Sequence, residues 1–161
     1  MINLNDKYGY VTEEINRQGY QLIKIDNKWH STDDNAVQAI IDSYDPIPDA
    51  RAEAILRINE QSQTYMQAIE DEYPEFEKRT WPTQKAEAEA WTLDNNALTP
   101  TLDTIALGRN MDRVVLIQKT YNKVQDYAYQ AATLAGKRQK IEDEIKASTD
   151  LDFICNVNFE A

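Results

Sequence analysis

Cysteine and histidine are almost missing from this sequence of 161 residues, with Cys155 and His30 as the only examples. A single cysteine excludes a disulfide within the chain, and one histidine excludes a site built from several Cys or His ligands. Glycine and proline are also scarce, with 4 Gly and 5 Pro. No apolar run approaches the ~18 residues of a membrane span. We therefore expect a folded domain rather than a fibrous, disordered or membrane-spanning chain.

Basic residues are outnumbered, 17 against 28 acidic ones, which gives a net charge of −11. Such a surface repels nucleic-acid phosphates and anionic lipids, so we expect neither nucleic acid nor membrane as a main partner. The first residues, MINLNDKYGY, lack the apolar stretch of a signal peptide. The sequence thus favours a protein that works in the reducing cytoplasm.

Catalytic chemistry finds little support. His30 has no identifiable partner and is expected to be a partly exposed strand residue, and Cys155 is expected to be a small buried apolar residue. The glycines stand singly, so no phosphate-binding loop is expected. Runs of acids at 70–72 and 142–144 point around a helix rather than at one point, which favours solvated helix faces. We predict no catalytic residue, no metal ligand and no cofactor-binding residue, and hence no enzyme.

Residues 1–46 are predicted to form a small module of a β-hairpin and a helix. The segment YQLIKI at 20–25 is rich in β-formers, and Asp26-Asn27 tolerate the positive φ of a tight turn before KWHS. Because no glycine follows Asn27, the turn type and the register stay open. A helix then begins at Thr32 or Asp33 and ends at Asp45-Pro46. Its predicted apolar stripe consists of Val37, Ile40, Ile41 and Tyr44.

Residues 47–148 are predicted to form an antiparallel helical bundle. Apolar periodicity and proline positions indicate helices from 49 to about 72, from Trp81-Pro82, from Pro100 and from about 111 to 146. The helix after Trp81 is expected to bury Ala86, Ala90 and Leu93, which leaves Trp91 off that face. The longest helix carries a seam like that of a coiled coil, formed by Val114, Ile117, Tyr121, Val124, Ala128, Ala131 and Ala135.

Residues 149–161 are predicted to form a C-terminal strand, because apolar residues alternate with mostly polar ones in LDFICNVNFEA. The strand pairs either with Gln21–Ile25 or with another chain. The predicted fold class is α-rich α+β: the N-terminal hairpin and helix module, the helical bundle, and this strand. Aromatic and apolar residues that could anchor a partner are Trp81, Trp91, Phe153, Val157 and Phe159.

The segment WPTQKAEAEAW at 81–91 resembles a Trp-Pro-x-Gln-x-x-Glu-Ala-x-Ala-Trp pattern found in bacteriophage tail-fibre assembly proteins and in a helical domain attached to fibre proteins. The resemblance continues through TPTLDTIALGR at 99–109 and GKRQKIEDEI at 136–145. Upstream, WHSTDDNAVQAIIDSYDP resembles the segment that commonly precedes the helical region. Together these segments cover about residues 29–146.

The resemblance implies a non-enzymatic viral protein that binds a phage tail-fibre or other tail protein. It helps the fibre fold as an assembly chaperone in the bacterial cytoplasm, or it remains on the virion tail as an accessory component. The alternative is a permanent structural subunit of the tail, baseplate or fibre joint. A third hypothesis, an acidic mimic of nucleic acid, expects carboxylates that face one way, whereas these acids are dispersed among basic residues. The oligomeric state, including a homo-oligomer, stays open.

Overall fold

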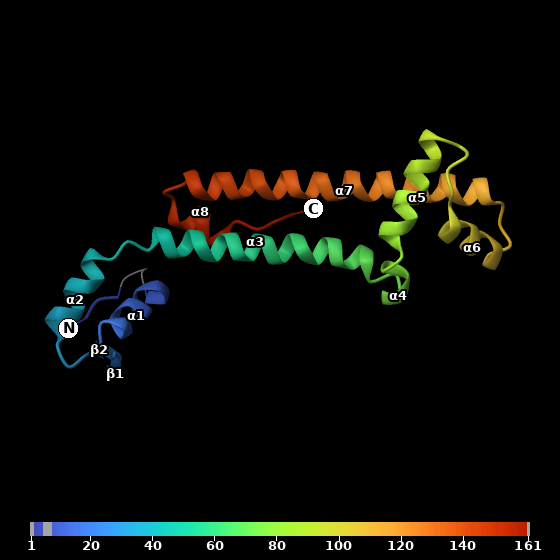
Figure 1. The fold of residues 1–161 in the computed structure, drawn as a ribbon. Coiled ribbons are helices and arrows are strands. Elements are labelled where there is room, and N and C mark those ends of the chain that lie inside the picture. Colours follow the sequence, from blue (N-terminus) through green and yellow to red (C-terminus); the bar gives the residue numbers. More distant parts are fainter. Residues whose placement is uncertain (1, 5–7, 161) are drawn as a thin grey trace. The chain divides into compact units, whose positions relative to one another are not determined.

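The computed structural model describes residues 2–4 and 8–160. Residues 1 and 5–7 of the predicted N-terminal module and residue 161 of the predicted tail lie outside this range. The chain divides into two compact units, residues 1–59 with 141–158 and residues 60–140 with 159–161. Two long helices, α3 (Ile47–Glu70) and α7 (Arg113–Ala147), contribute residues to both units (Figure 1). Each unit is described by itself below.

The first unit begins with a helix that the sequence analysis did not foresee, α1 (Tyr8–Arg17). Val11 and Ile15, one helical turn apart, are both fully buried. The turn after the helix passes through Gly19, whose φ of 87° suits glycine because it has no Cβ. The core around α1 also contains Ile2, Leu4, Val37 and Ile41, with Tyr20, Leu22, Trp29, Ile40 and Tyr44 packed against it.

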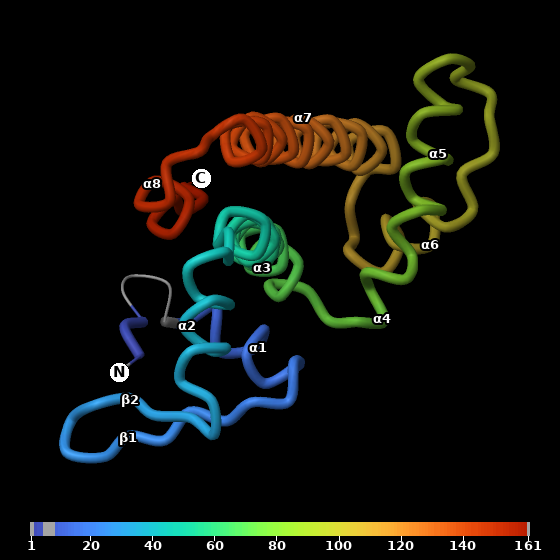
Figure 2. The backbone as a smooth tube through the Cα atoms, turned by 90° about the vertical axis from the view of Figure 1, so that its left-hand side faces the viewer, coloured from blue at the N-terminus to red at the C-terminus, as the bar shows by residue number. Residues whose placement is uncertain are grey.

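The predicted hairpin is confirmed as β1 (Ile23–Ile25) and β2 (Lys28–His30), which pair antiparallel. Asp26 and Asn27 form the two-residue turn with φ of 49° and 61°. Two positive φ values define the turn type whose twist matches that of the strands. The register places Ile25 opposite Lys28, and Figure 2 shows the two strands leading to this turn.

Helix α2 (Asp34–Ser43) is also confirmed, with Asp33 as its N-cap. The Asp33 carboxylate accepts hydrogen bonds from the backbone N–H groups of Asn35 and Ala36, at 3.1 and 3.0 Å. These bonds satisfy donors that have no partner within the helix. The helix ends at Ser43, before Asp45-Pro46.

The predicted C-terminal strand is wrong. Residues Leu151–Asn156 form a short helix, α8, whose N-cap Asp150 accepts from the backbone N–H of Phe153. Ile154, the residue that breaks the polar alternation, is the buried one. Arg57 of α3 donates to the carbonyls of Ile154 and Val157, at 3.0 and 2.9 Å, and so pairs acceptors at the C-terminal end of α8. Capping at both ends thus stabilises a helix where the period favoured a strand.

The second unit contains three shorter helices beside its parts of α3 and α7: α4 (Glu75–Lys78), α5 (Trp81–Leu93) and α6 (Pro100–Gly108). Its core consists of Ala88, Leu102, Ala106, Leu116 and Ile117. As predicted, α5 and α6 carry a proline in their first turns, where the missing N–H costs no helical bond. Asn110, with φ of 49°, follows the end of α6.

The predicted buried face of α5 is wrong. Leu93 is 90% exposed, whereas Ala88 is fully buried and Trp91 packs against the core beside it. Helix α5 packs against α6 through the side of α5 that carries Glu87, Ala88 and Trp91. Trp91 is therefore a core residue rather than a residue displayed off the buried face.

The predicted seam of α7 is partly realised within this unit. Ile117 is fully buried, and Tyr121 packs against the core. Val114 is half exposed, whereas Leu116, which is not part of the predicted seam, is buried beside Ile117. The α-rich α+β class is confirmed by these elements. None of the described helices has both the length and the apolar character of a membrane span.

Candidate protein-binding site

An aromatic cluster around Trp81 is the best candidate site in the second unit. It consists of Tyr73, Trp81 and Tyr127. The Trp81 ring lies 5.2 Å from that of Tyr73 and 6.4 Å from that of Tyr127, with interplanar angles of 80° and 64°. Such edge-to-face contacts add about 0.5–1.5 kcal/mol to the burial of each pair.

Trp81 reaches this position because it opens α5. Pro82 stands in the first turn of α5, where a proline is favoured, and Thr80 before it donates its hydroxyl to the carbonyl of Glu77 at 2.7 Å. Tyr73 comes from the turn that precedes α4, and Tyr127 comes from the middle of α7. The turn before α4, the start of α5 and the middle of α7 therefore meet at one indole ring.

Each of the two tyrosines also contacts a charged side chain. The Tyr127 hydroxyl donates to Glu70 Oε1 at 2.7 Å. This bond to a carboxylate, and then burial, raise the pKa of Tyr127. Lys123 lies 5.3 Å from the Tyr73 ring centre and donates to its hydroxyl at 3.2 Å. The cluster thus combines an apolar body with one negative and one positive group, a composition that suits a protein contact.

A second structural motif, the cap of α6, lies within the same unit. The carboxylate of Glu87 accepts from the backbone N–H groups of Thr101 and Leu102, at 3.0 and 2.9 Å. Glu87 is only 9% exposed, and its negative charge meets the positive end of the α6 dipole. This role is not evident from the sequence, although Glu87, one turn before Trp91, belongs to the segment 81–91 that carries the resemblance.

Arg113 at the start of α7 also binds the first turn of α6 and the residue before it. It donates to Asp103 Oδ1 at 2.5 Å and to the Thr99 hydroxyl at 2.7 Å. The Thr99 hydroxyl in turn donates to Asp103 at 2.8 Å. These bonds from Thr99 and Arg113 lower the pKa of Asp103. The network joins α6 to α7.

The five residues predicted to anchor a partner are divided between the two units, three in the second and two in the first. Trp81 lies in the aromatic cluster, and Trp91 lies in the α5–α6 core. Phe159 is 4% exposed, packs edge-to-face on Tyr65 at 5.6 Å, and donates its N–H to Gln61. In the first unit, Phe153 is partly exposed on α8, and Val157 offers its carbonyl to Arg57. Of these, Trp81 is half-buried and lies beside the partly exposed ring of Tyr127.

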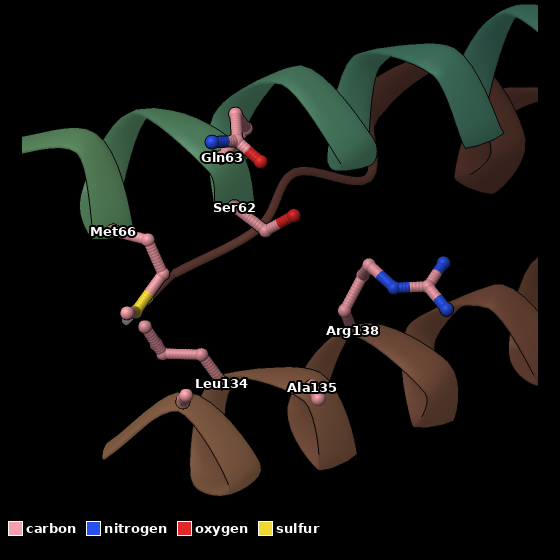
Figure 3. A pocket seen from close by; sticks show the side chains of 7 residues that line it. Ser62, Gln63, Met66, Leu134, Ala135 and Arg138 are labelled. Atoms are coloured by element: carbon pink, nitrogen blue, oxygen red, sulfur yellow. The ribbon is translucent and has the colours of Figure 1, made fainter. Parts of the chain in front are cut away.

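Each of the two units has a depression in its described surface. One of about 180 Å³ lies between α3 and α7 in the second unit, where Met66 and Leu134 point toward each other and Arg138 lies further along (Figure 3). This volume is below the roughly 300 Å³ at which small-molecule pockets begin. The other, of about 360 Å³, lies in the first unit and is lined by Tyr10, Glu13, Glu14, Arg17, Tyr44 and Asp49.

Four of the side chains that line the larger depression are paired with each other. Arg17 is paired with Glu14, and the Tyr44 hydroxyl donates to Asp49. Burial, and next the bond to Asp49, raise the pKa of Tyr44. Near its edge, the Tyr10 hydroxyl lies 3.4 Å from Cys155 Sγ, a contact that raises the pKa of Tyr10. Five of the six lining residues thus have a partner, and the described residues contain no cluster of three metal-ligating side chains.

A comparison with protein-family models, with curated proteins and with solved structures finds no match to this chain.

Proposed function

We propose that this protein is a phage tail-fibre assembly chaperone or tail-fibre accessory protein that acts by protein–protein binding and without catalysis. Its place of action is the cytoplasm of the bacterial host, with retention on the virion tail as the accessory form. The proposal begins from the resemblance of residues 81–91 and 99–109 to tail-fibre-associated proteins. It is supported by what these residues do in the fold.

The observation that carries the proposal is the bond between the two resembling segments. Glu87 from the first segment caps the helix formed by the second, through the N–H groups of Thr101 and Leu102. Trp91 packs against the core that contains Leu102. The residues of the pattern therefore specify a scaffold, in which Glu87 serves as a helix cap. Because a scaffold alone does not assign a function, the proposal also depends on the surface that this scaffold presents.

The surface of this scaffold suits contact with an unfinished fibre. Three leucines of the second unit, Leu93, Leu98 and Leu107, are each more than four-fifths exposed. Half-buried Trp81 and partly exposed Tyr127 add aromatic surface. Fibre chains expose apolar surface and unpaired strand edges before their trimer closes, and such species aggregate unless they are covered. Exposed apolar side chains on an acidic, soluble scaffold are able to cover them.

Co-expression tests the proposal. A trimeric phage tail-fibre protein is produced in bacteria with and without this chain, and the yield of soluble, heat-resistant trimer is measured. We expect the chain to raise that yield several-fold. An unchanged yield, together with no complex on size-exclusion chromatography, would remove the basis for a fibre-related role.

Variants then locate the contact. Trp81→Ala should reduce the trimer yield, whereas Phe76→Ala should retain it, because Phe76 is an exposed aromatic outside the cluster. Circular dichroism of both variants checks that the fold persists. Equal losses from the two variants would show that the cluster is not the contact.

Purified virions separate the chaperone from the alternative, a permanent structural subunit of the tail, baseplate or fibre joint. A chaperone is absent from the particles, whereas an accessory protein or a subunit remains in them. Among retained proteins, a permanent subunit is also required for tail assembly in a deletion phage, whereas an accessory protein affects only the fibre.

A further inference from the structure

The outer edge of β1 presents unpaired backbone groups. In a hairpin with a two-residue turn, the residues that flank the turn, here Ile25 and Lys28, form a hydrogen-bonded pair. The next pair along an antiparallel ladder is not hydrogen-bonded, so the N–H and C=O groups of Lys24 and Trp29 point away from each other. Lys24 therefore directs its backbone groups outward from β1.

The opposite edge of the hairpin supports this geometry and shows a segment bound there. The carbonyl of Trp29 accepts from the N–H of Ile2 at 3.4 Å, in an isolated antiparallel bridge. The edge of β2 is thus extended by one residue of the chain itself. Among the described residues, the sheet contains only β1 and β2, and no bridge extends β1.

The side chains of β1 make this edge apolar on one face and basic on the other. Ile23 and Ile25 share one face and are 54% and 53% exposed. Lys24 points to the other face, where its ammonium lies 5.5 Å from the centre of the Trp29 ring. Exposed apolar residues on an unpaired edge strand are the usual features of a site for strand addition.

Charge decides between two occupants of this edge. A second copy that paired β1 with β1 about a two-fold axis at Lys24 would place two lysines directly opposite each other, which is destabilising. A lysine on an edge strand opposes such self-pairing. An acidic residue opposite Lys24 is favourable, and apolar residues on either side of it would then lie beside Ile23 and Ile25.

We propose that the outer edge of β1 is a binding site for an extended partner strand with an apolar–acidic–apolar pattern, which adds to the hairpin as a further antiparallel or parallel strand. The inference rests on the proposed function, since a fibre chain that has not yet closed its trimer offers such strands. It names the surface of this protein that would hold them.

A synthetic peptide with Val–Glu–Val at its centre, and a matched peptide with Val–Lys–Val, test the site on the full chain. Amide hydrogen exchange at Lys24 and NMR titration report binding. We expect the glutamate peptide to slow exchange at Lys24 about tenfold or more, and the lysine peptide to bind several-fold more weakly. Absence of protection by either peptide would overturn the proposal.

Substitutions at Lys24 provide the matched variants. Lys24→Pro removes the outward N–H and no bond of the hairpin, so it should abolish peptide binding, whereas Lys24→Ala should retain most of it. If Lys24→Pro fails to fold, Lys24→Glu replaces it and should reverse the preference toward the lysine peptide. Unchanged binding by Lys24→Pro, or an unchanged preference in Lys24→Glu, contradicts the site. A concentration-dependent dimer abolished by Lys24→Pro would identify a second copy as the occupant instead.

The same variant separates this inference from the proposed function. If Lys24→Pro still raises the yield of soluble fibre trimer, the edge is not the contact and the chaperone role stands. If the wild-type chain fails in co-expression but the peptide protects Lys24, the site exists and the fibre is not its partner.

Discussion

Glu87 shows how a single carboxylate joins two helices. It lies on α5, yet it satisfies two N–H groups of α6 that the helix itself leaves unpaired. Replacement by alanine would leave both donors in a nearly dry environment. We expect Glu87→Ala to lower the free energy of unfolding by about 1–3 kcal/mol, measured by urea denaturation.

The control for Glu87 is its neighbour Glu89 on the same helix. Glu89 is more exposed and makes a single long contact with Lys85, at 3.9 Å. Glu89→Ala should change stability by about 0.5 kcal/mol or less. Equal effects from the two variants would show that the cap contributes nothing beyond helix propensity.

Asp103 gives the fold a dependence on acid. Because Thr99 and Arg113 lower its pKa in the folded state, the folded protein holds the ionised form more tightly than the unfolded chain does. This contribution is present above the unfolded pKa, about 3.9, and is lost as the pH falls through the lower folded value.

Asp103→Asn should therefore lower the midpoint of urea unfolding at pH 7. The difference in midpoint between this variant and the wild type should shrink at about pH 3. Asp143→Asn, on the exposed surface of α7, serves as the control and should have a small effect at both values. A difference for Asp103→Asn that stays constant with pH would mean that its ionisation is not coupled to folding.

Residue identity alone could predict some of these roles and not others. The N-cap Asp33 is local, since its partners lie two and three residues ahead, and the sequence predicted it. The partners of Glu87 lie 14 and 15 residues away, so the role depends on how α5 and α6 pack. The same holds for Trp91, which was predicted to lie off the buried face because the alanines beside it gave no clear stripe, but packs against the core.

At the scale of the element, α8 shows the limit of hydrophobic periodicity. Its six residues are too few to separate a period of 2 from one of 3.6. The N-cap Asp150 and Arg57, which binds the C-terminal end of α8, stabilise the helix over the strand. The hairpin, by contrast, was predictable because its turn residues, Asp26 and Asn27, impose the connection locally.

The two conformations of this segment predict opposite results from two substitutions. In the helix, Ile154 is fully buried and Phe153 is 36% exposed, whereas a strand would place Phe153 inside. We expect Ile154→Ala to cost about 2–5 kcal/mol of unfolding free energy and Phe153→Ala clearly less. Urea denaturation of both variants checks this, and the reverse order would restore the strand.

At the scale of the whole molecule, the chain contains two units, each with a buried core of its own. The first is centred on Val11, Ile15, Val37 and Ile41, and the second on Ala88, Leu102 and Ile117. The sequence predicted most of the helices in both, but it could not predict that α3 and α7 each contribute to both units. That division depends on contacts between residues far apart in the chain.

Separate cores predict separate local stability. Ile41→Ala should lower the amide hydrogen-exchange protection of α1 and α2 strongly, by removing a fully buried side chain, and should leave that of α5 and α6 within about tenfold of the wild type. Leu102→Ala should do the reverse, since Leu102 is equally buried in the other core. If either substitution lowers protection equally everywhere, α3 and α7 couple the two cores into one cooperative unit. In that case a partner bound at the β1 edge would also stabilise the core around Leu102, whereas independent cores confine its effect to α1 and α2.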